Sequence, residues 1–453
     1  MDYIPGQDRV PAKYLAELKR VREYFTNDNK PNFKFERILG TGARGFAVEL
    51  QIKEESSPSR PSLQTTKLPP RKPSFDVAPR SQSPFQPSRL QLPQSLPLRP
   101  SLPQSPSLLP LPSLSIGPAR NPPALLPAGK KVERFVMKRA FERRDDETIR
   151  KEIEFLRKLH GAENIQQLYS LPNETQALEL HYLPGPTLFT EWIPNGQLRD
   201  LVKTRPDWNH PLPNRMLWMC FLCMCHMLIA MAWPPQGNPD APSTKPALPP
   251  QNSQGQRPPK STIRHNDINI GNIMFGDFDT AAHQNVPILK LIDFGQASNS
   301  GESFQYTPES AVRQNMLKMA EVMINLIGGA VSMKNDGIKV MEALVNRQVQ
   351  NIRSRAKDLD GLSRGYGLDN AAINKQKTWL DNLDIDLRSL LIRCLAVDEN
   401  VRPTLEELYE EVHRNVTQKT RDSYAGKRWQ NNESDEAIFT ISKNLIVRSD
   451  NRI

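Results

Sequence analysis

The chain has 453 residues, a formal net charge of +10, four cysteines and 41 prolines, a proline share well above the usual one of about 5%. Nineteen prolines stand between residues 56 and 130, where nine basic residues face the single acidic Asp76, so that segment alone contributes +8. The remainder is close to neutral, which argues against a nucleic-acid groove. The cysteines form only one cluster, at residues 220–225, which argues against a zinc site.

The first predicted elements are a helix and two strands. Residues 11–25 have helical spacing and form a leading helix in an N-terminal helical or flexible extension, residues 1–32. Residues 33–39 and 47–52 are typical of strands that enclose a glycine-rich turn. The basic proline-rich stretch then follows as a disordered insert, residues 54–130, because it has too few large apolar residues to fold alone.

Regular structure resumes after this insert. We expect a strand at residues 134–138, a helix at 145–160 with an acidic first turn, a strand at 187–193 and a short helix at 198–203. The apolar run 216–233 is nearly long enough to cross a membrane. It lacks aromatic belts and basic flanks, so we interpret it as the central helix of a globular lobe and expect no membrane association.

A second proline-rich insert, residues 234–261, is also expected to be disordered. From residue 312 the pattern is helical nearly to residue 415, with loops near 328–335 and 361–368. The remaining residues, 417–453, are predicted to form a polar tail with weak periodicity.

Strands early in the chain and helices later predict an α+β protein. A small antiparallel-sheet lobe, residues 33–193, is joined to a larger helical lobe, residues 194–416. Growth of a turn from about five to about eighty residues costs only about 2.4 kcal/mol of loop-closure free energy, so the sheet tolerates the first insert.

Three sets of residues carry candidate chemistry. Gly40, Gly42 and Gly45 form a Gly-x-Gly-x-x-Gly pattern between two strands, which suits backbone contact with phosphates but also fits an ordinary hairpin loop. Lys138 and Glu152 follow on a strand and a helix, where a carboxylate can hold a phosphate-binding lysine. Each of these two, taken singly, is better explained as a solvated surface charge.

The third set lies in residues 264–272, RHNDINIGN, and 291–295, LIDFG. Asp267 is positioned to orient an acceptor hydroxyl and accept its proton. Asn272 and Asp293 are an amide and a carboxylate of the kind that holds magnesium in phosphoryl transfer. The order of all three sets along the chain favours a shared phosphoryl-transfer site over unrelated surface residues.

In this order of motifs the chain resembles the eukaryotic protein kinase family, from about residue 33 to residue 414, as a divergent serine/threonine-type member. The resemblance implies a bilobal protein-kinase-like fold, ATP and Mg²⁺ as cofactors, and a protein substrate. It implies contacts with ATP by Gly40, Gly42, Gly45, Lys138, Glu152, the gatekeeper Thr190, and the backbone of Glu191 and Ile193. It also implies that Asp267 is the catalytic aspartate and that Asn272 and Asp293 are the metal ligands.

Residues 393–404 look like the late segment of that family, in which an arginine pairs with a glutamate of the activation segment. Residues 306–309, Tyr-Thr-Pro-Glu, are expected to supply this glutamate, Glu309. The pattern departs from the family at Asn266, which replaces an arginine that pairs with a phosphorylated activation loop. We therefore expect activity that does not depend on phosphorylation of that segment.

Asn269 replaces the lysine that contacts the transferring phosphate, and the segment 293–309 is short. Slow turnover is expected, since one missing donor costs about 10² to 10³ in rate. Small-molecule kinases also lack this lysine. Within the first insert, residues 67–73 and 84–89 have the spacing of polyproline ligands for Src-homology-3 type domains, although a passive linker explains them as well.

The sequence thus predicts an ATP-dependent phosphotransferase, a serine/threonine protein kinase, in the cytoplasm or nucleus. The compartment follows from few cysteines and polar first residues. Two alternatives remain open. One is a pseudokinase scaffold that binds partners through its proline-rich inserts, and the other is a small-molecule kinase.

Overall fold

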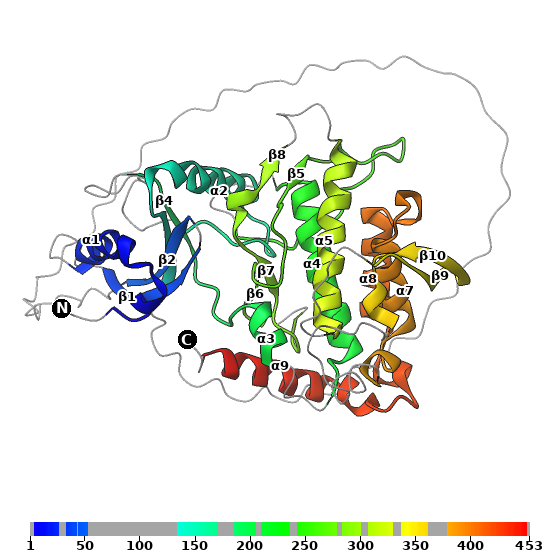
Figure 1. Cartoon of the computed structure of the whole chain (residues 1–453). Coiled ribbons are helices and arrows are strands. Elements are labelled where there is room, and N and C mark those ends of the chain that lie inside the picture. The colour runs from blue at the N-terminus through cyan, green and yellow to red at the C-terminus, as the bar shows by residue number, and fades with distance from the viewer. Residues whose placement is uncertain are drawn as a thin grey trace, which may run out of the picture. The chain divides into compact units, whose positions relative to one another are not determined.

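A computed structural model of the chain is mixed α and β, with small antiparallel sheets and several helices (Figure 1). The structure describes residues 4–26, 33–42, 44–52, 134–169, 185–204, 210–235, 242–278, 283–299, 307–328, 337–360 and 378–450. These residues belong to one compact unit formed by Met1–Glu54 and Val132–Ile453. The first proline-rich insert and its two polyproline motifs lie outside the described residues.

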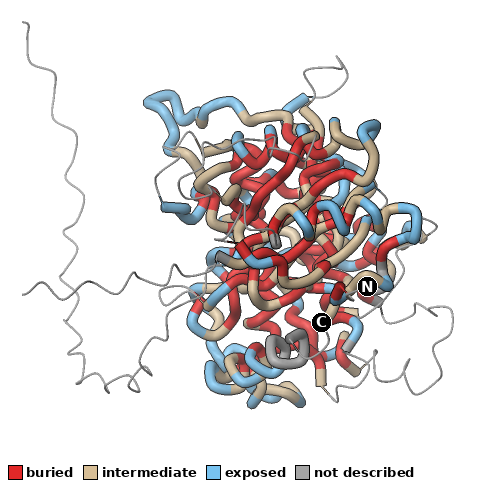
Figure 2. Tube along the Cα trace, turned by 90° about the vertical axis from the view of Figure 1, so that its left-hand side faces the viewer, coloured by how far each residue is buried: buried red, intermediate tan, exposed pale blue. Residues whose placement is uncertain are grey.

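The strands are β1 Phe33–Thr41, β2 Gly45–Ile52, β3 Arg134–Ala140, β4 Thr187–Glu191, β5 Ile263–Arg264, β6 Ile273–Phe275, β7 Leu289–Leu291, β8 Ser298–Asn299, β9 Lys339–Val345 and β10 Gln348–Ser354. The helices are α1 Leu15–Thr26, α2 Asp146–Lys158, α3 Leu198–Thr204, α4 Asn214–Ala232, α5 Pro308–Gly328, α7 Ile385–Cys394, α8 Leu405–Gln418 and α9 Asp435–Asp450. Buried residues run through the interior of the described chain (Figure 2).

The largest sheet has the order β1-β2-β3-β4, and all its neighbours are antiparallel. Its register places Gly40 opposite Ala47, and Ala47 opposite Lys138. The four predicted strands are confirmed, but Gly40 and Gly45 lie inside β1 and β2. The glycine-rich segment is therefore a tight hairpin, in which the Gly42 amide donates to the Gly45 carbonyl over 2.8 Å.

The leading helix is confirmed, but residues 4–26 are not a flexible extension. Leu18, Val21 and Phe25 of α1 are almost fully buried and belong to the same apolar cluster as the strand residues Phe33 and Phe135. An aromatic chain connects them, with edge-to-face contacts from Phe25 to Phe33 and from Phe33 to Phe135. Helix α1 thus completes the core of the four-stranded sheet.

Helix α4 is the apolar run that was predicted to be a core helix. By length and composition it is able to span a membrane, yet 83% of its most apolar window is buried within the protein. It packs against α5 and α8, beside which it lies in Figure 1. Its three cysteines, Cys220, Cys223 and Cys225, are buried and free, as the sequence predicted.

The helical prediction was wrong for residues 339–354, which form the β9–β10 hairpin. Burial alternates along β9, with Met341 and Ala343 inside and Val340 exposed, which is the period of a strand. The turn residues Asn346 and Arg347 both have positive φ, 50° and 65°, as tight hairpin turns of two residues require. Two short strands of mixed composition are not distinguished from a helix when only their apolar content is considered.

The second proline-rich insert also needs correction, because residues 242–261 make defined contacts. The Thr244 amide donates to the Gly161 carbonyl over 2.8 Å, and the Glu163 amide donates to the Thr244 carbonyl over 2.9 Å. The indole of Trp233, which follows α4, donates to the Pro258 carbonyl over 2.8 Å. Proline carbonyls accept these bonds although prolines donate none, so a proline-rich segment packs here without regular secondary structure.

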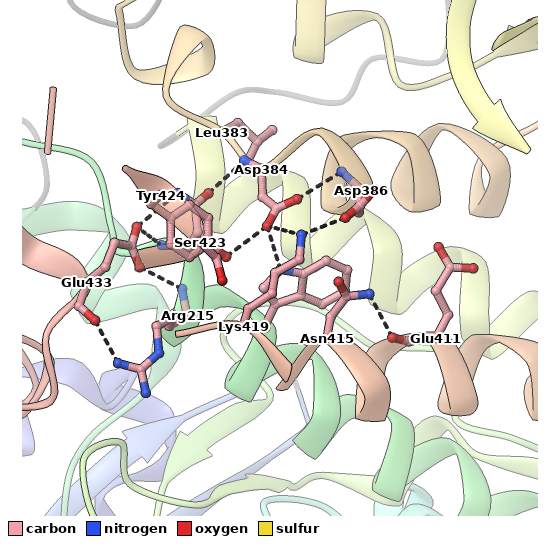
Figure 3. A network of polar contacts seen from close by, with 12 residues as sticks. Arg215, Leu383, Asp384, Asp386, Glu411, Asn415, Lys419, Ser423, Tyr424 and Glu433 are labelled. Atoms are coloured by element: carbon pink, nitrogen blue, oxygen red, sulfur yellow. Dashed lines mark hydrogen bonds and ion pairs between the residues drawn. The ribbon is translucent and has the colours of Figure 1, made fainter. Parts of the chain in front are cut away.

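The C-terminal residues are part of the fold instead of a polar tail. Figure 3 shows the buried carboxylate of Asp384, which accepts hydrogen bonds from Tyr424 over 2.8 Å and from Lys419 over 2.5 Å. Glu433 accepts from the Asn214 amide over 2.8 Å and therefore caps the first turn of α4. Among the described C-terminal residues, Tyr424 and Glu433 are buried and, with the half-buried Lys419, form a polar network with the rest of the fold.

Candidate active site

Three charged side chains from three elements meet in one place. The ammonium of Lys138 on β3 lies 2.7 Å from Glu152 Oε2 on α2 and 2.7 Å from Asp293 Oδ1, directly after β7. These residues stand 14 and 155 positions apart from Lys138 in the sequence. The tertiary structure thus brings the lysine of β3 and the glutamate of α2 to the carboxylate of Asp293.

Burial and charge oppose each other within this triad. Burial lowers the pKa of Lys138, but the attraction of Glu152 and Asp293 outweighs it, so the pKa is raised and the ammonium is kept. Burial raises the pKa of Glu152 in spite of Lys138. Burial also raises the pKa of Asp293, but the charge of Lys138 and its hydrogen bond outweigh burial. The pKa of Asp293 is therefore below its usual range. The lysine is therefore held in its charged form between the two carboxylates.

Helix α2 reaches this site closely because of a glycine. A Cβ added at Gly295 would lie 2.9 Å from Thr148 Cγ2 and 3.3 Å from Asp293 Oδ1, so a side chain there would push α2 away. Asp293 itself adopts a left-handed backbone conformation with φ 64°, which costs a non-glycine residue on the order of 1 kcal/mol. Asp293 keeps this unfavourable backbone conformation while its carboxylate pairs with Lys138.

The second half of the site is the loop between β5 and β6. Both carboxylate oxygens of Asp267 accept hydrogen bonds: Oδ1 from the Asn269 amide over 3.0 Å and Oδ2 from the Asn272 amide over 2.9 Å. The backbone carbonyl of Asn272 accepts from the Ile292 amide over 2.9 Å, which holds the loop beside Asp293. Asp267 is exposed and therefore accessible to an acceptor molecule.

His265 fixes the backbone of this loop from inside. Its Nε2 lies 3.0 Å from the Ile292 carbonyl, and its Nδ1 accepts from the Asp267 amide over 3.3 Å. These roles require a neutral ring with the proton on Nε2. Burial lowers the pKa of His265, which keeps the ring neutral, and Phe294 packs edge-to-face against it at 4.6 Å.

No protein-family model matches the chain, and no curated protein matches it in sequence. The function is therefore inferred from the chain's own residues and their geometry.

Two asparagines, the departing Asn266 and Asn315 of α5, hold the loop that contains Asp267. The Asn266 amide donates to the Gln296 carbonyl and to the Ser298 hydroxyl, each over 2.9 Å. Asn266 thus connects the loop directly to the residues after Asp293. No phosphate group is needed for this connection. Asn315 of α5 accepts from the His265 amide over 3.2 Å and donates to the Ile263 carbonyl over 2.8 Å, and so holds the start of the loop.

The glycine hairpin lies on the same sheet as Lys138. A Cβ at Gly40 would meet no atom within 4 Å, so the backbone there is open to a ligand. At Gly45 a Cβ would lie 2.2 Å from the Arg139 carbonyl oxygen, which makes glycine obligatory for the pairing of β2 with β3. Gly40 is therefore open to a phosphate contact, whereas the Gly42 amide already donates to the Gly45 carbonyl and Gly45 is explained by packing.

The residues expected to contact adenine lie at and just after the end of β4. Thr190 is buried, and its hydroxyl accepts from Gln166 over 2.9 Å. The Glu191 carboxylate pairs with Lys290 at 2.7 Å, and its amide donates to the Gln167 carbonyl. Because the Glu191 amide is already hydrogen-bonded, a ligand would bind to the Glu191 carbonyl or to the backbone of Ile193.

A divalent cation would depend on few protein ligands. Among the described residues no group of three His, Cys, Asp or Glu side chains lies together. The amide oxygen of Asn272 and the carboxylate of Asp293 are hard oxygen donors, which suit magnesium when phosphate oxygens and water complete its shell. Asp267 engages the nitrogen of the Asn272 amide, not its oxygen, so the donor set fits such an ion.

One predicted pair is not formed. Glu309 pairs with Lys260 at 3.1 Å, whereas the arginines of the late segment have other partners: Arg402 pairs with Glu399 at 3.2 Å and Arg393 with Glu411 at 2.9 Å. The sequence contained no signal for Lys260, because it stands in a proline-rich stretch with no periodic pattern.

Proposed function

We propose that the chain is an ATP- and magnesium-dependent phosphotransferase with a protein-kinase-like fold, which transfers the γ-phosphate to a serine or threonine hydroxyl of a protein. The observation that carries this proposal is the triad of Lys138, Glu152 and Asp293, with 2.7 Å between the ammonium and each carboxylate. A surface lysine would not be placed between a buried glutamate and a strained aspartate.

Each group has a distinct role in this reaction. Lys138 binds phosphate oxygens of ATP and is oriented by Glu152, and the backbone of Gly40 approaches the phosphates. The acceptor oxygen forms a bond to the γ-phosphorus while the bond to the ADP oxygen breaks, and Asp267 receives the hydroxyl proton late in this step. Magnesium held by Asn272 and Asp293 would neutralise the charge that develops on the phosphate oxygens.

The site also supports slow turnover. Asn269 occupies the position at which a lysine would contact the transferring phosphate, and its amide instead binds Asp267 over 3.0 Å. The developing negative charge therefore has one cationic donor fewer. A protein acceptor is favoured over a small molecule by the exposed position of Asp267.

The test measures release of ADP, phosphate transfer to a mixture of peptides and to the chain itself, and nucleotide affinity. Lys138→Met and Asp267→Ala should each reduce turnover at least 10²-fold. Asp267→Ala should retain nucleotide affinity, because the Asp267 side chain contacts its own loop and not the nucleotide. Lys158→Met is the matched control, since its pair with Glu154 at 2.6 Å on α2 is exposed. It should retain full turnover.

Three outcomes would overturn the proposal. Turnover that survives both substitutions would exclude this site as the source of activity. Nucleotide binding by the wild-type chain without any turnover would support the scaffold alternative. Phosphate on choline-like or sugar acceptors, with none on peptides, would support the small-molecule alternative.

A further inference from the structure

Lys260 lies where three helices come together. Its ammonium is 3.1 Å from Glu309 in the first turn of α5 and 3.2 Å from Glu406 in the first turn of α8. It also lies 5.5 Å from the ring centroid of Trp233, which ends α4. The side chain is only 14% exposed, so its charge acts in a poorly solvated place.

The residues after Lys260 lead directly into the candidate catalytic loop. Ser261 is anchored to the end of α4, where its amide donates to the Ala232 carbonyl over 2.6 Å. Ile263 and His265 follow and are bound by Asn315 of α5. Helix α5 therefore holds the stretch before Asp267 at two points, through Glu309 at Lys260 and through Asn315 at Ile263 and His265.

We propose that Lys260 is a positioning residue that sets the place of the Asp267 loop relative to α5, an inference that rests on the proposed function. Two carboxylates within 3.2 Å of one ammonium would repel each other without it. The first turn of α5 would then shift, and Asn315 would move the backbone of Ile263 and His265 with it. The second proline-rich segment thus contributes a residue to the site.

The chain offers a matched control in Lys419. Its ammonium also joins two carboxylates, those of Asp384 at 2.5 Å and Asp386 at 2.6 Å, and it lies 5.5 Å from the ring centroid of Trp218. It is 18% exposed, close to the value for Lys260. The contacts of Lys419 lie away from the Asp267 loop. Its substitution therefore shows how much a loss of stability alone changes kcat.

The first measurement compares kcat and the KM for ATP in Lys260→Met, Lys260→Arg and Lys419→Met. Lys260→Met should lower kcat about tenfold and leave the KM for ATP unchanged, because the misplaced group is Asp267. Lys260→Arg should restore most of the loss, since it keeps the cation. Lys419→Met should lower the melting temperature without a change in kcat of folded protein. Equal kcat losses in both methionine variants would overturn the proposal.

The second measurement does not need activity and separates this proposal from the proposed function. Amide hydrogen exchange in residues 263–272 should be at least fivefold faster in Lys260→Met, and unchanged there in Lys419→Met. If the wild-type chain turns over no ATP, the proposed function fails while faster exchange still shows that Lys260 holds the loop. Unchanged exchange in Lys260→Met would overturn the positioning role whatever the activity.

Discussion

At the scale of single residues, the candidate base Asp267 is held by two asparagines. Asn269 and Asn272 each bind one of its carboxylate oxygens, at 3.0 Å and 2.9 Å. Each oxygen retains a further lone pair for an acceptor hydroxyl, so the loop remains competent. Under the proposed function, we therefore expect the missing cation at residue 269, and not the base, to limit the rate.

Asn269→Lys should raise turnover by about tenfold or more, because it adds a cationic donor near the transferring phosphate. The gain stays below the largest effects known for such donors, since Asn269 also accepts the Gly271 amide over 2.8 Å. Steady-state ATP turnover checks this expectation. Asn269→Ala is the control, because it removes the hydrogen bond to Asp267 without adding a cation. An equal gain in that variant would show that the loss of this bond, and not the added cation, raises turnover.

At the scale of elements, a buried histidine attaches the second proline-rich segment to α4. His226 Nδ1 lies 2.6 Å from the Pro246 carbonyl, and Tyr409 of α8 covers its ring edge-to-face at 5.7 Å. Burial lowers the pKa of His226 to about 4, and the bond to Pro246 only partly opposes this. The nearby charges of Lys245, His283 and His413 act in the same direction as burial.

The chain should lose stability as the pH falls from 6.5 towards 4, because the unfolded histidine takes up a proton before the folded one. One pKa unit corresponds to about 1.4 kcal/mol, so the contribution of His226 is about 3 kcal/mol. His226→Gln retains a donor for Pro246 and should flatten this part of the curve of unfolding free energy against pH. The exposed His413→Gln should change the slope far less, because the charge of His413 is the smallest of these influences on the pKa of His226. Identical slopes in all three proteins would contradict the prediction.

At the scale of the whole molecule, the C-terminal residues close the helical part of the fold. Asp384 is buried among Trp218, Lys419 and Tyr424, and its carboxylate accepts hydrogen bonds from all three side chains. The pKa of Asp384 is lowered because these bonds outweigh burial. A buried carboxylate that loses such partners is strongly destabilising, by about 3 to 5 kcal/mol.

A chain that stops after Gln418 should therefore unfold without cooperativity or melt at least 10 °C lower. It loses Lys419 and Tyr424 from Asp384, and Glu433 from the start of α4. Thermal unfolding followed by circular dichroism measures this. A chain that stops after Asp450 keeps α9 and these contacts, and it should melt like the wild type. If both truncations melt alike, the C-terminal network does not stabilise the fold.

Local patterns in the sequence were sufficient for much of the fold. Helix α2 followed from its apolar periodicity, since a helix that covers a core repeats its apolar residues at a fixed period. Helix α4 followed from the length of its unbroken apolar run, and the strands of the first sheet followed from short strand-like runs. The hairpin at residues 339–354 was missed, because its register depends on the turn at Asn346 and Arg347. The polar composition of residues 417–453 likewise concealed a network whose partners lie far away in the chain.

For the site, the sequence by itself singled out the candidate residues, which are Lys138, Glu152, Asp267, Asn272 and Asp293. Their type and order are local information. Only the tertiary structure decided that Lys138 contacts Glu152 and Asp293, and that Lys260 and not an arginine faces Glu309. The physical reason is that an ion pair between distant residues depends on where the backbone brings them, and no short-range pattern records its partners.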